Sequence, residues 1–84
     1  MLLKDVLGLF SKDINEMVVA IEYGGSPNDF CVKIEYEGYF ANVHLYSDGT
    51  ASFELVEPKY SYIPAKLISA YSWMRMDWEV WKCL

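Results

Sequence analysis

The stretch that decides the fold is residues 30–57, FCVKIEYEGYFANVHLYSDGTASFELVE. Apolar and polar side chains alternate through residues 30–36 with the period of two that marks a half-buried β-strand. Gly38 interrupts the alternation, and Glu37-Gly38 suits a two-residue hairpin loop. This loop makes every inward cross-strand pair apolar or aromatic. The predicted pairs are Phe30 with Leu45, Val32 with Val43, Ile34 with Ala41, and Tyr36 with Tyr39.

The length of the second turn follows from the side chains that each alternative would bury. A two-residue loop at Asp48-Gly49 would place Glu54 opposite Val43 on the inward face. A three-residue loop, Ser47-Asp48-Gly49, with Gly49 in the left-handed conformation, keeps that face apolar. Because a slip of one residue would turn the whole apolar set to the wrong face, we predict the three-residue loop. Its inward pairs are Leu45 with Ala51, Val43 with Phe53, and Ala41 with Leu55.

The segment before this stretch predicts a helix and one more strand. In residues 2–10 the apolar side chains Leu3, Val6, Leu7 and Phe10 fall at helical spacing. This short amphipathic helix is expected to end at Ser11-Lys12-Asp13, with Gly8 weakening its middle. Residues 16–23 alternate again and predict a strand, followed by a loop at residues 24–29. Its expected inward side chains are Met17, Val19, Ile21 and Tyr23.

The C-terminal segment predicts a second helix. Pro58 stops the sheet, and Pro64 supplies the backbone angle favoured in a first helical turn. Alternating steps of four and three residues then give one stripe that can cover the sheet. The stripe contains Leu67, Tyr71, Met74, Trp78 and Trp81. Residues 77–84 fit a helix, a strand or a tail. The fold class predicted for this single domain, residues 1–84, is α+β: helix, four-stranded antiparallel meander, helix, with the helices on the inward face.

Composition restricts the classes of function. The 84-residue chain is 54% hydrophobic, which is outside the range of disordered chains, and its formal net charge is −5. An acidic chain without a basic stripe is unsuited to nucleic acid, whereas it suits a basic surface on another protein. Solubility is the alternative reason for this charge. The two cysteines indicate free thiols, and the absence of a signal region or long apolar run predicts a cytoplasmic, membrane-free protein.

The predicted register also places polar side chains together on the opposite face of the sheet. One expected row is Glu22, Cys31, His44 and Ser52, the next is Ala20, Lys33, Asn42 and Glu54, and the third is Val18, Glu35, Phe40 and Val56. A thiol beside an imidazole is an arrangement used by nucleophilic enzymes. An open sheet face lacks a cleft and oxyanion donors, and zinc needs three or four ligands. We therefore predict no catalysis, metal or cofactor.

The side chains favoured for contact with a partner protein are acidic or aromatic and lie on this face or in its loops. They are Glu22, Glu35, Glu37, Phe40, Tyr46, Asp48 and Glu54. Aromatic anchors dominate the energetics of many interfaces, which also makes the later aromatic residues candidates. Those are Tyr60, Tyr62, Trp73, Trp78 and Trp81. In so small a chain, part of them is expected to fill the core instead.

The central hairpin resembles that of small bacterial immunity proteins of the TriTu type. The corresponding residues are Val43, Leu45, Tyr46, Ser47, Asp48 and Gly49, followed by Phe53, Glu54, Leu55 and Val56. They cover about a third of the chain. The order of elements along the sequence also agrees, with one amphipathic helix before the sheet and another after it. Tyr46 stands where the family commonly has Trp, and Trp78 and Trp81 have no counterpart. The resemblance implies a protein that neutralises an interbacterial ADP-ribosyltransferase toxin by tight binding, without catalysis of its own.

The functional hypothesis is therefore a small acidic inhibitor, most simply an antitoxin-like immunity protein that occludes a toxin enzyme. One alternative is an inhibitor of a host defence protein encoded by a phage or mobile element. A self-associating structural module is another, in which the outer face or edge strands pair with a second copy. The protein is expected to be a monomer or homodimer. The sequence does not identify the partner.

Overall fold

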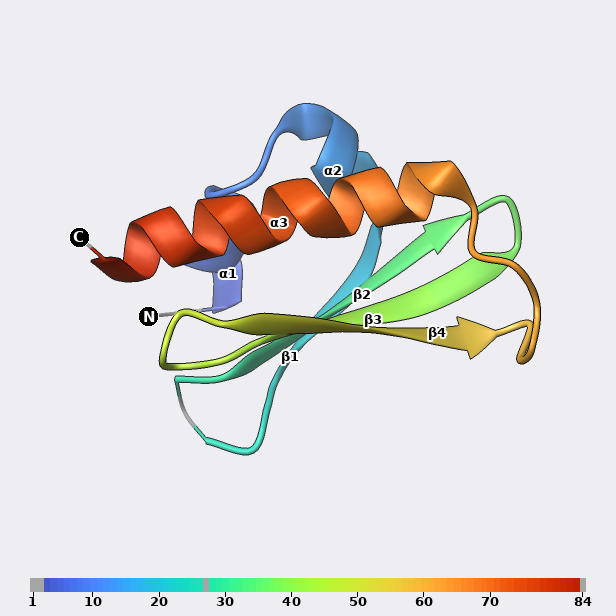
Figure 1. The fold of residues 1–84 in the computed structure, drawn as a ribbon. Helices are drawn as coiled ribbons and strands as arrows, with labels where there is room; N and C mark the ends of the chain where they lie inside the picture. The colour runs from blue at the N-terminus through green and yellow to red at the C-terminus, as the bar shows by residue number, and fades with distance from the viewer. Residues whose placement is uncertain (1–2, 27, 84) are drawn as a thin grey trace.

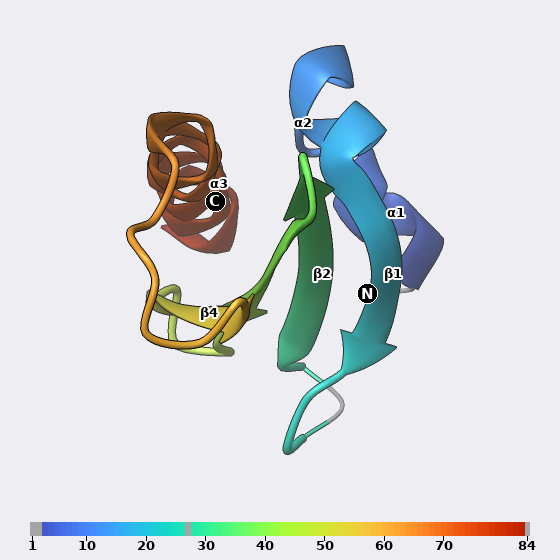
Figure 2. The same cartoon turned by 90° about the vertical axis from the view of Figure 1, so that its right-hand side faces the viewer.

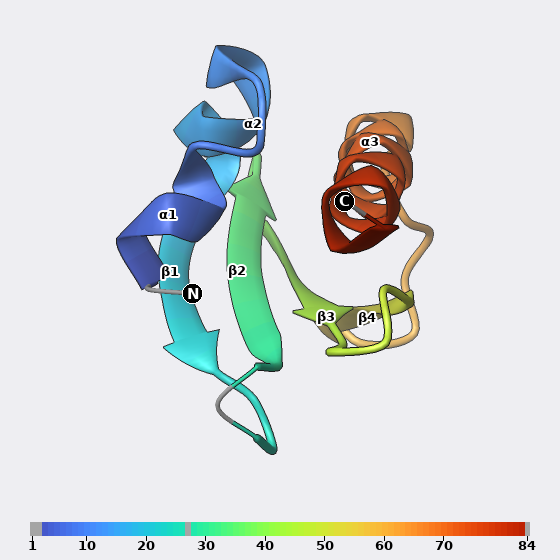
Figure 3. The ribbon, with the colours of Figure 1, turned by 90° about the vertical axis from the view of Figure 1, so that its left-hand side faces the viewer.

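The centre of the computed structural model, which describes residues 3–26 and 28–83, is a four-stranded antiparallel sheet. The strands are β1 (Val18–Tyr23), β2 (Phe30–Tyr36), β3 (Tyr39–Leu45) and β4 (Ala51–Glu57), and they lie side by side in chain order (Figure 1). The sheet is strongly twisted, so that β1 and β2 run nearly upright where β3 and β4 lie nearly flat (Figures 2 and 3).

The register of the three later strands is as the alternation predicts. Each of the predicted inward pairs between β2, β3 and β4 is present, from Phe30 with Leu45 to Ala41 with Leu55. Glu37 and Gly38 both have positive φ, 48° and 84°, as a two-residue hairpin loop with matching twist requires. Gly49 has φ of 92° in the three-residue loop. The apolar face and the turn residues therefore specify the same pairing.

Within the described residues, three helices cover the inward face of the sheet. They are α1 (Leu3–Leu7), α2 (Lys12–Met17) and α3 (Ala65–Cys83). Seen from one end, α3 lies above β3 and β4, whereas α1 lies against β1 (Figure 3). The buried side chains Val6, Phe10 and Ile14 join the same hydrophobic core as β2, β3 and α3. The α+β fold predicted from the sequence is thus confirmed.

The N-terminal segment forms two short helices rather than the single helix predicted for residues 2–10. The first ends at Leu7, before Gly8, and residue 2 lies outside the described residues. Ser11 does not end a helix but begins one, because its hydroxyl oxygen accepts a hydrogen bond from the Ile14 amide at 3.3 Å and caps α2. Asn15 joins the two helices by donating through Nδ2 to the Leu7 carbonyl at 2.9 Å.

Strand β1 begins at Val18, two residues later than predicted, because Lys12–Met17 is helical. Tyr23 pairs with Phe30 and Ile21 with Val32 as expected. A bulge between Val18 and Ala20 then shifts the register, so that Val18 pairs with Ile34. Val19, predicted to face the core, is 60% exposed as a result. An extra residue in one strand reverses the facing of its neighbours, which the alternation alone does not reveal.

Helix α3 runs through the segment for which the sequence left three conformations open. It begins after Pro64 and continues to Cys83, so residues 77–83 are helical, while Leu84 lies outside the described residues. Leu67, Met74 and Trp78 are fully buried. The Trp78 ring meets Phe30 edge-on with centroids 5.8 Å apart and stacks on Trp81 at 5.4 Å. Burial of this indole stabilises the helix and selects it over a strand.

Specific polar contacts hold the turns to the rest of the molecule. The indole N–H of Trp78 donates to the Tyr46 carbonyl at 2.8 Å, which fixes α3 over the β3–β4 turn. The Tyr71 hydroxyl donates to the Ala51 carbonyl at 3.3 Å. Between loops, the Asp29 carboxylate accepts from the Ser47 amide at 2.6 Å. The turn that carries Tyr46 and Asp48 is therefore supported from both the helix and the neighbouring loop.

Candidate partner-binding face

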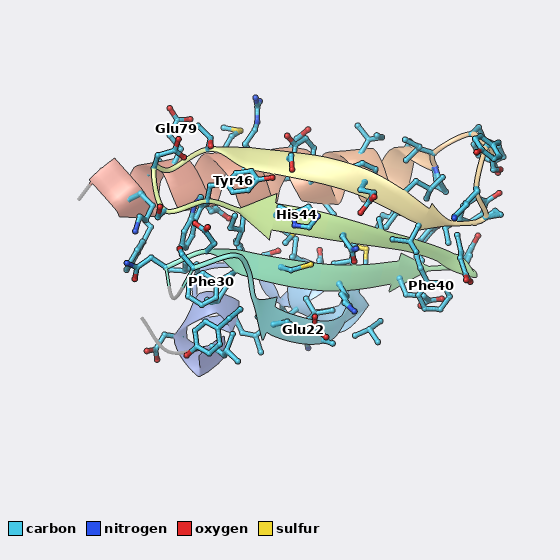
Figure 4. All side chains as sticks on the ribbon, turned by 90° about the horizontal axis from the view of Figure 1, so that it is seen from below. Glu22, Phe30, Phe40, His44, Tyr46 and Glu79 are labelled. Carbon is cyan, nitrogen blue, oxygen red and sulfur yellow. The ribbon has the colours of Figure 1, made fainter. Side chains whose placement is uncertain are left out.

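The sheet has one face that α1, α2 and α3 leave uncovered, and we call it the outer face. Figure 4 views it directly, with Glu22, His44, Tyr46 and Phe40 labelled. Its first two predicted rows are present as cross-strand neighbours. Its side chains from the paired strands are Ala20, Glu22, Cys31, Lys33, Glu35, Phe40, Asn42, His44, Ser52, Glu54 and Glu57.

The centre of the outer face combines acidic groups with two basic ones. Lys33 Nζ lies 3.4 Å from a Glu22 carboxylate oxygen, and both side chains are about half exposed. His44 Nε2 lies 3.8 Å from Glu54 Oε1, and the same oxygen lies 3.5 Å from Asn42 Nδ2. These are exposed pairs, which contribute little to stability. Because the Glu22 and Glu54 side chains are themselves exposed, their carboxylates remain accessible to groups on another protein.

Aromatic side chains lie at the two ends of β3. At one end Tyr46 stacks on His44 with ring centroids 6.3 Å apart, and its hydroxyl is 2.9 Å from Ser52 Oγ. At the other end Phe40 is 40% exposed and borders a shallow hollow of about 270 Å³ with Val19 and Val56. Six residues of strand place these ends roughly 20 Å apart.

The seven predicted contact residues thus form two terminal groups and a centre. Glu35, Glu37 and Phe40 lie near the first hairpin, Tyr46 and Asp48 lie near the second, and Glu22 and Glu54 lie between them. The third predicted row is wrong at both edges, because the bulge turns Val18 inward and a second irregularity pairs Phe40 with Glu57 instead of Val56. Glu35 and Phe40 do face each other as predicted.

Two of the carboxylates also support turns. Glu35 Oε1 accepts from the Gly38 amide at 3.1 Å. Asp48 Oδ1 accepts from the Thr50 hydroxyl at 2.6 Å and from the Thr50 amide at 3.0 Å. The hydroxyl and amide bonds hold the pKa of the Asp48 carboxyl below its usual range. Asp48 consequently keeps its negative charge even in mild acid.

Cys31 and His44 are direct cross-strand neighbours, as predicted, but the thiol is not activated. Cys31 is buried, and this burial is the main cause that raises its pKa; Lys33 opposes the rise, while Glu22 and Glu54 add to it. A nucleophilic cysteine needs the opposite shift. Among residues 3–26 and 28–83, no group of three or more His, Cys, Asp or Glu side chains is placed to hold a metal ion. The Cys83 side chain lies outside the described residues.

Several exposed apolar side chains lie outside the predicted set of seven contact residues. Val19 is turned outward by the bulge, and Tyr23 remains 49% exposed at the edge although its ring lies 5.6 Å from that of Phe30. Of the later aromatic residues, Tyr60, Tyr62 and Trp73 are exposed, whereas Trp78 is buried and Trp81 half-buried. Trp73 falls outside the predicted inward stripe of α3, and this position in the sequence already indicates that its side chain is exposed.

Comparison with known proteins adds no relative. A scan against protein-family models, a search of curated proteins and a search of solved structures each find no significant match. Within the part of the chain that the structure describes, no helix is both long enough and apolar enough to cross a membrane.

Proposed function

We propose that the protein is a small inhibitor that binds another protein through the outer face of its sheet. The central supporting observation is that this face is free of helices while all seven candidate residues lie on it or in the turns at its ends. A broad, uncovered sheet surface with aromatic groups at both ends suits docking against a second surface.

The chemistry of the face favours a partner with a basic surface. Counting Glu22, Glu35, Glu54 and Glu57 against Lys33, the paired strands contribute a net charge of −3 to this face with His44 neutral, and Glu37 and Asp48 add further negative charge at the turns. Complementary charge raises association rates and selects the correct partner. Phe40 and Tyr46 would supply the apolar contacts that slow dissociation.

The resemblance of the central hairpin to TriTu-type immunity proteins narrows the proposal. On that basis the partner is a toxin enzyme, specifically an interbacterial ADP-ribosyltransferase, and inhibition occurs by occlusion of its active site. An enzyme cleft that binds a negatively charged dinucleotide presents basic groups, which would be matched by Glu22 and Glu54. The inhibitor needs no catalytic group for this role, in keeping with the unactivated thiol of Cys31.

The proposal is tested by reversing charge on the outer face without disturbing the core. The variant Glu35→Lys/Glu37→Lys/Glu54→Lys should keep its cooperative unfolding transition but lose rescue of cells that express an ADP-ribosyltransferase toxin that the unmodified chain neutralises. Purified toxin should associate with the variant more slowly, with the difference shrinking as salt is added.

A matched control carries the same charge change away from the outer face. The variant Asp13→Lys/Asp77→Lys/Glu79→Lys alters exposed or half-exposed acidic side chains of α2 and α3, and should still rescue. Equal loss of rescue by both triple variants, with both folded, would show that total charge rather than the outer face is responsible. Full rescue by the outer-face variant would exclude this face as the binding site.

A further inference from the structure

Two irregularities at opposite edges of the sheet meet on the outer face. In β1, Val19 is the extra residue of the bulge. In β4, Val56 is extra in the same way, because Phe40 pairs with Glu57 instead of with Val56. β1 and β4 are the outermost strands, yet both extra residues line the same hollow of about 270 Å³ beside Phe40. Bulges commonly lie next to functional sites, where they re-aim side chains.

The hollow changes in character from one edge of the sheet to the other. Its lining residues come from all four strands. On the β1 side its wall is the exposed apolar side chain of Val19. On the β4 side it is lined by Val56 and by Glu57, an exposed residue that is the cross-strand neighbour of Phe40. A ligand that fills the hollow therefore needs an apolar part and a positively charged end.

The Glu57 carboxylate is not balanced by a basic group of the chain. Within the part of the chain that the structure describes, no ion pair involves Glu57. Lys33 also lines the hollow, but its Nζ lies 3.4 Å from a carboxylate oxygen of Glu22, a residue outside the lining. Glu35 adds a second negative charge on the other side of Phe40. The exposed aromatic ring thus lies between two acidic residues, and this end of the hollow attracts a cation.

We propose that the hollow binds an arginine side chain of the partner protein. The aliphatic stem of the arginine lies against Val19 and Val56, while its guanidinium lies beside the Phe40 ring and donates to the Glu57 carboxylate. Arginine suits the site better than lysine, because a guanidinium is planar and weakly hydrated and can stack on a ring while it bonds a carboxylate. The inference rests on the proposed function and adds the chemistry that one partner residue must have.

Titration of the isotope-labelled protein with short capped peptides, followed by NMR at constant ionic strength, tests the proposal without the partner. A tripeptide with arginine between two glycines should bind with a dissociation constant on the order of millimolar and shift the amide signals of Val19, Phe40 and Val56. The lysine peptide should bind at least about threefold more weakly, and the leucine peptide should cause no saturable shift. Equal binding of the arginine and lysine peptides, or no localised shift up to roughly 50 mM arginine peptide, would overturn the proposal.

Two isosteric substitutions on β4 locate the charge that binds the arginine peptide. Glu57→Gln should weaken binding by about fivefold or more, because it removes the carboxylate and keeps its shape. Glu54→Gln is the matched control, since Glu54 is exposed on the same strand but does not line the hollow. Thermal unfolding of both variants should match that of the unmodified chain. Equal weakening by the two substitutions would show attraction to net charge alone and would overturn the site.

The aromatic ring and the inhibitory role are tested separately. Phe40→Leu should weaken the arginine peptide more than the lysine peptide, because it removes the ring on which a guanidinium stacks. A chain that neutralises no toxin but binds the arginine peptide through Glu57 would refute the proposed function and support the arginine site. If toxin binding survives Glu57→Gln but is lost in the triple lysine variant of the outer face, the inhibitory role stands and the arginine site is overturned.

Discussion

Trp78 and Tyr46 connect the core to the outer face through a single hydrogen bond. The buried indole of Trp78 donates to the backbone carbonyl of Tyr46, while the Tyr46 side chain stacks on His44 on the opposite side of the sheet. The position of an exposed aromatic group therefore depends on a buried one 32 residues later in the chain. This relationship makes the packing of α3 a determinant of the candidate binding face.

The substitution Trp78→Phe should destabilise the protein by about 2–4 kcal/mol. It leaves the Tyr46 carbonyl without its donor and opens space beside Phe30. Urea unfolding measures the loss, and Trp73→Phe, at an exposed site, serves as the control with little change. If both substitutions lower the free energy of unfolding equally, the hydrogen bond and burial of Trp78 add no stability beyond that of an exposed tryptophan.

Replacing Gly49 by alanine should lower stability by about 1–2 kcal/mol. The residue has φ of 92°, which disfavours any side chain, and an added Cβ would lie 3.4 Å from the Lys82 Cβ. Gly25→Ala is the matched control, because its added Cβ has nothing within 4 Å. Thermal denaturation of the two variants should separate them clearly. If Gly49→Ala left the stability unchanged, residue 49 would not adopt a positive φ in solution.

Loss of the Ser11 cap should cost about 1 kcal/mol. Ser11→Ala removes the acceptor for the Ile14 amide and leaves the start of α2 unsatisfied. Ser47→Ala provides the comparison, since the contact of Ser47 with Asp29 uses its backbone amide and survives the change. Hydrogen exchange at the Ile14 amide should accelerate in Ser11→Ala alone, and unchanged exchange would argue against the cap.

The stability that the Asp48 carboxylate contributes to its turn should decrease as the pH is lowered. Because the Thr50 bonds lower the pKa of the folded Asp48 carboxyl, their stabilising contribution is present above its unfolded pKa and is lost as pH falls through the folded value. Thr50→Val removes the hydroxyl donor but keeps the amide donor. The pKa of Asp48 should therefore rise toward its unfolded value without reaching it. Carboxyl NMR titration gives both values, and an identical pKa in the two proteins would contradict the assignment.

Cys31 should behave as an unreactive thiol. Its pKa is raised, with desolvation as the main cause, so little thiolate exists at neutral pH. In a Cys83→Ser background, alkylation by iodoacetamide should be slow in the native protein and fast in denaturant. The native rate should climb as pH rises toward the raised pKa. Rapid alkylation at neutral pH would point to an activated cysteine and revive a catalytic interpretation.

The sheet could be predicted because its residues carry redundant information. Only one pairing of Val43 keeps Glu54 out of the core, and Gly38 and Gly49 occupy the positions where that pairing needs turns. The N-terminal helices could not be predicted in this way. Ser11 is equally typical of a helix end and a helix cap, and helices of five and six residues give too few repeats for a reliable period.

Tertiary packing determines the conformation of the segments that the sequence pattern leaves open. Residues 77–82 alternate like a strand, and burial of Trp78 against Phe30 makes them helical. Val18 and Val19 are both apolar, so no local signal tells which of them faces the core at the bulge. For the candidate face, strand phase predicted which side chains share a surface. It did not predict that Glu35 and Asp48 would also hold turns, since that depends on side-chain rotamers.

The contact between the Asp29 carboxylate and the Ser47 amide has a consequence for protein engineering. It joins two connections that are separate in sequence, so a peptide grafted into one would shift the other. A chimaera built on this scaffold should therefore exchange both loops as a single unit.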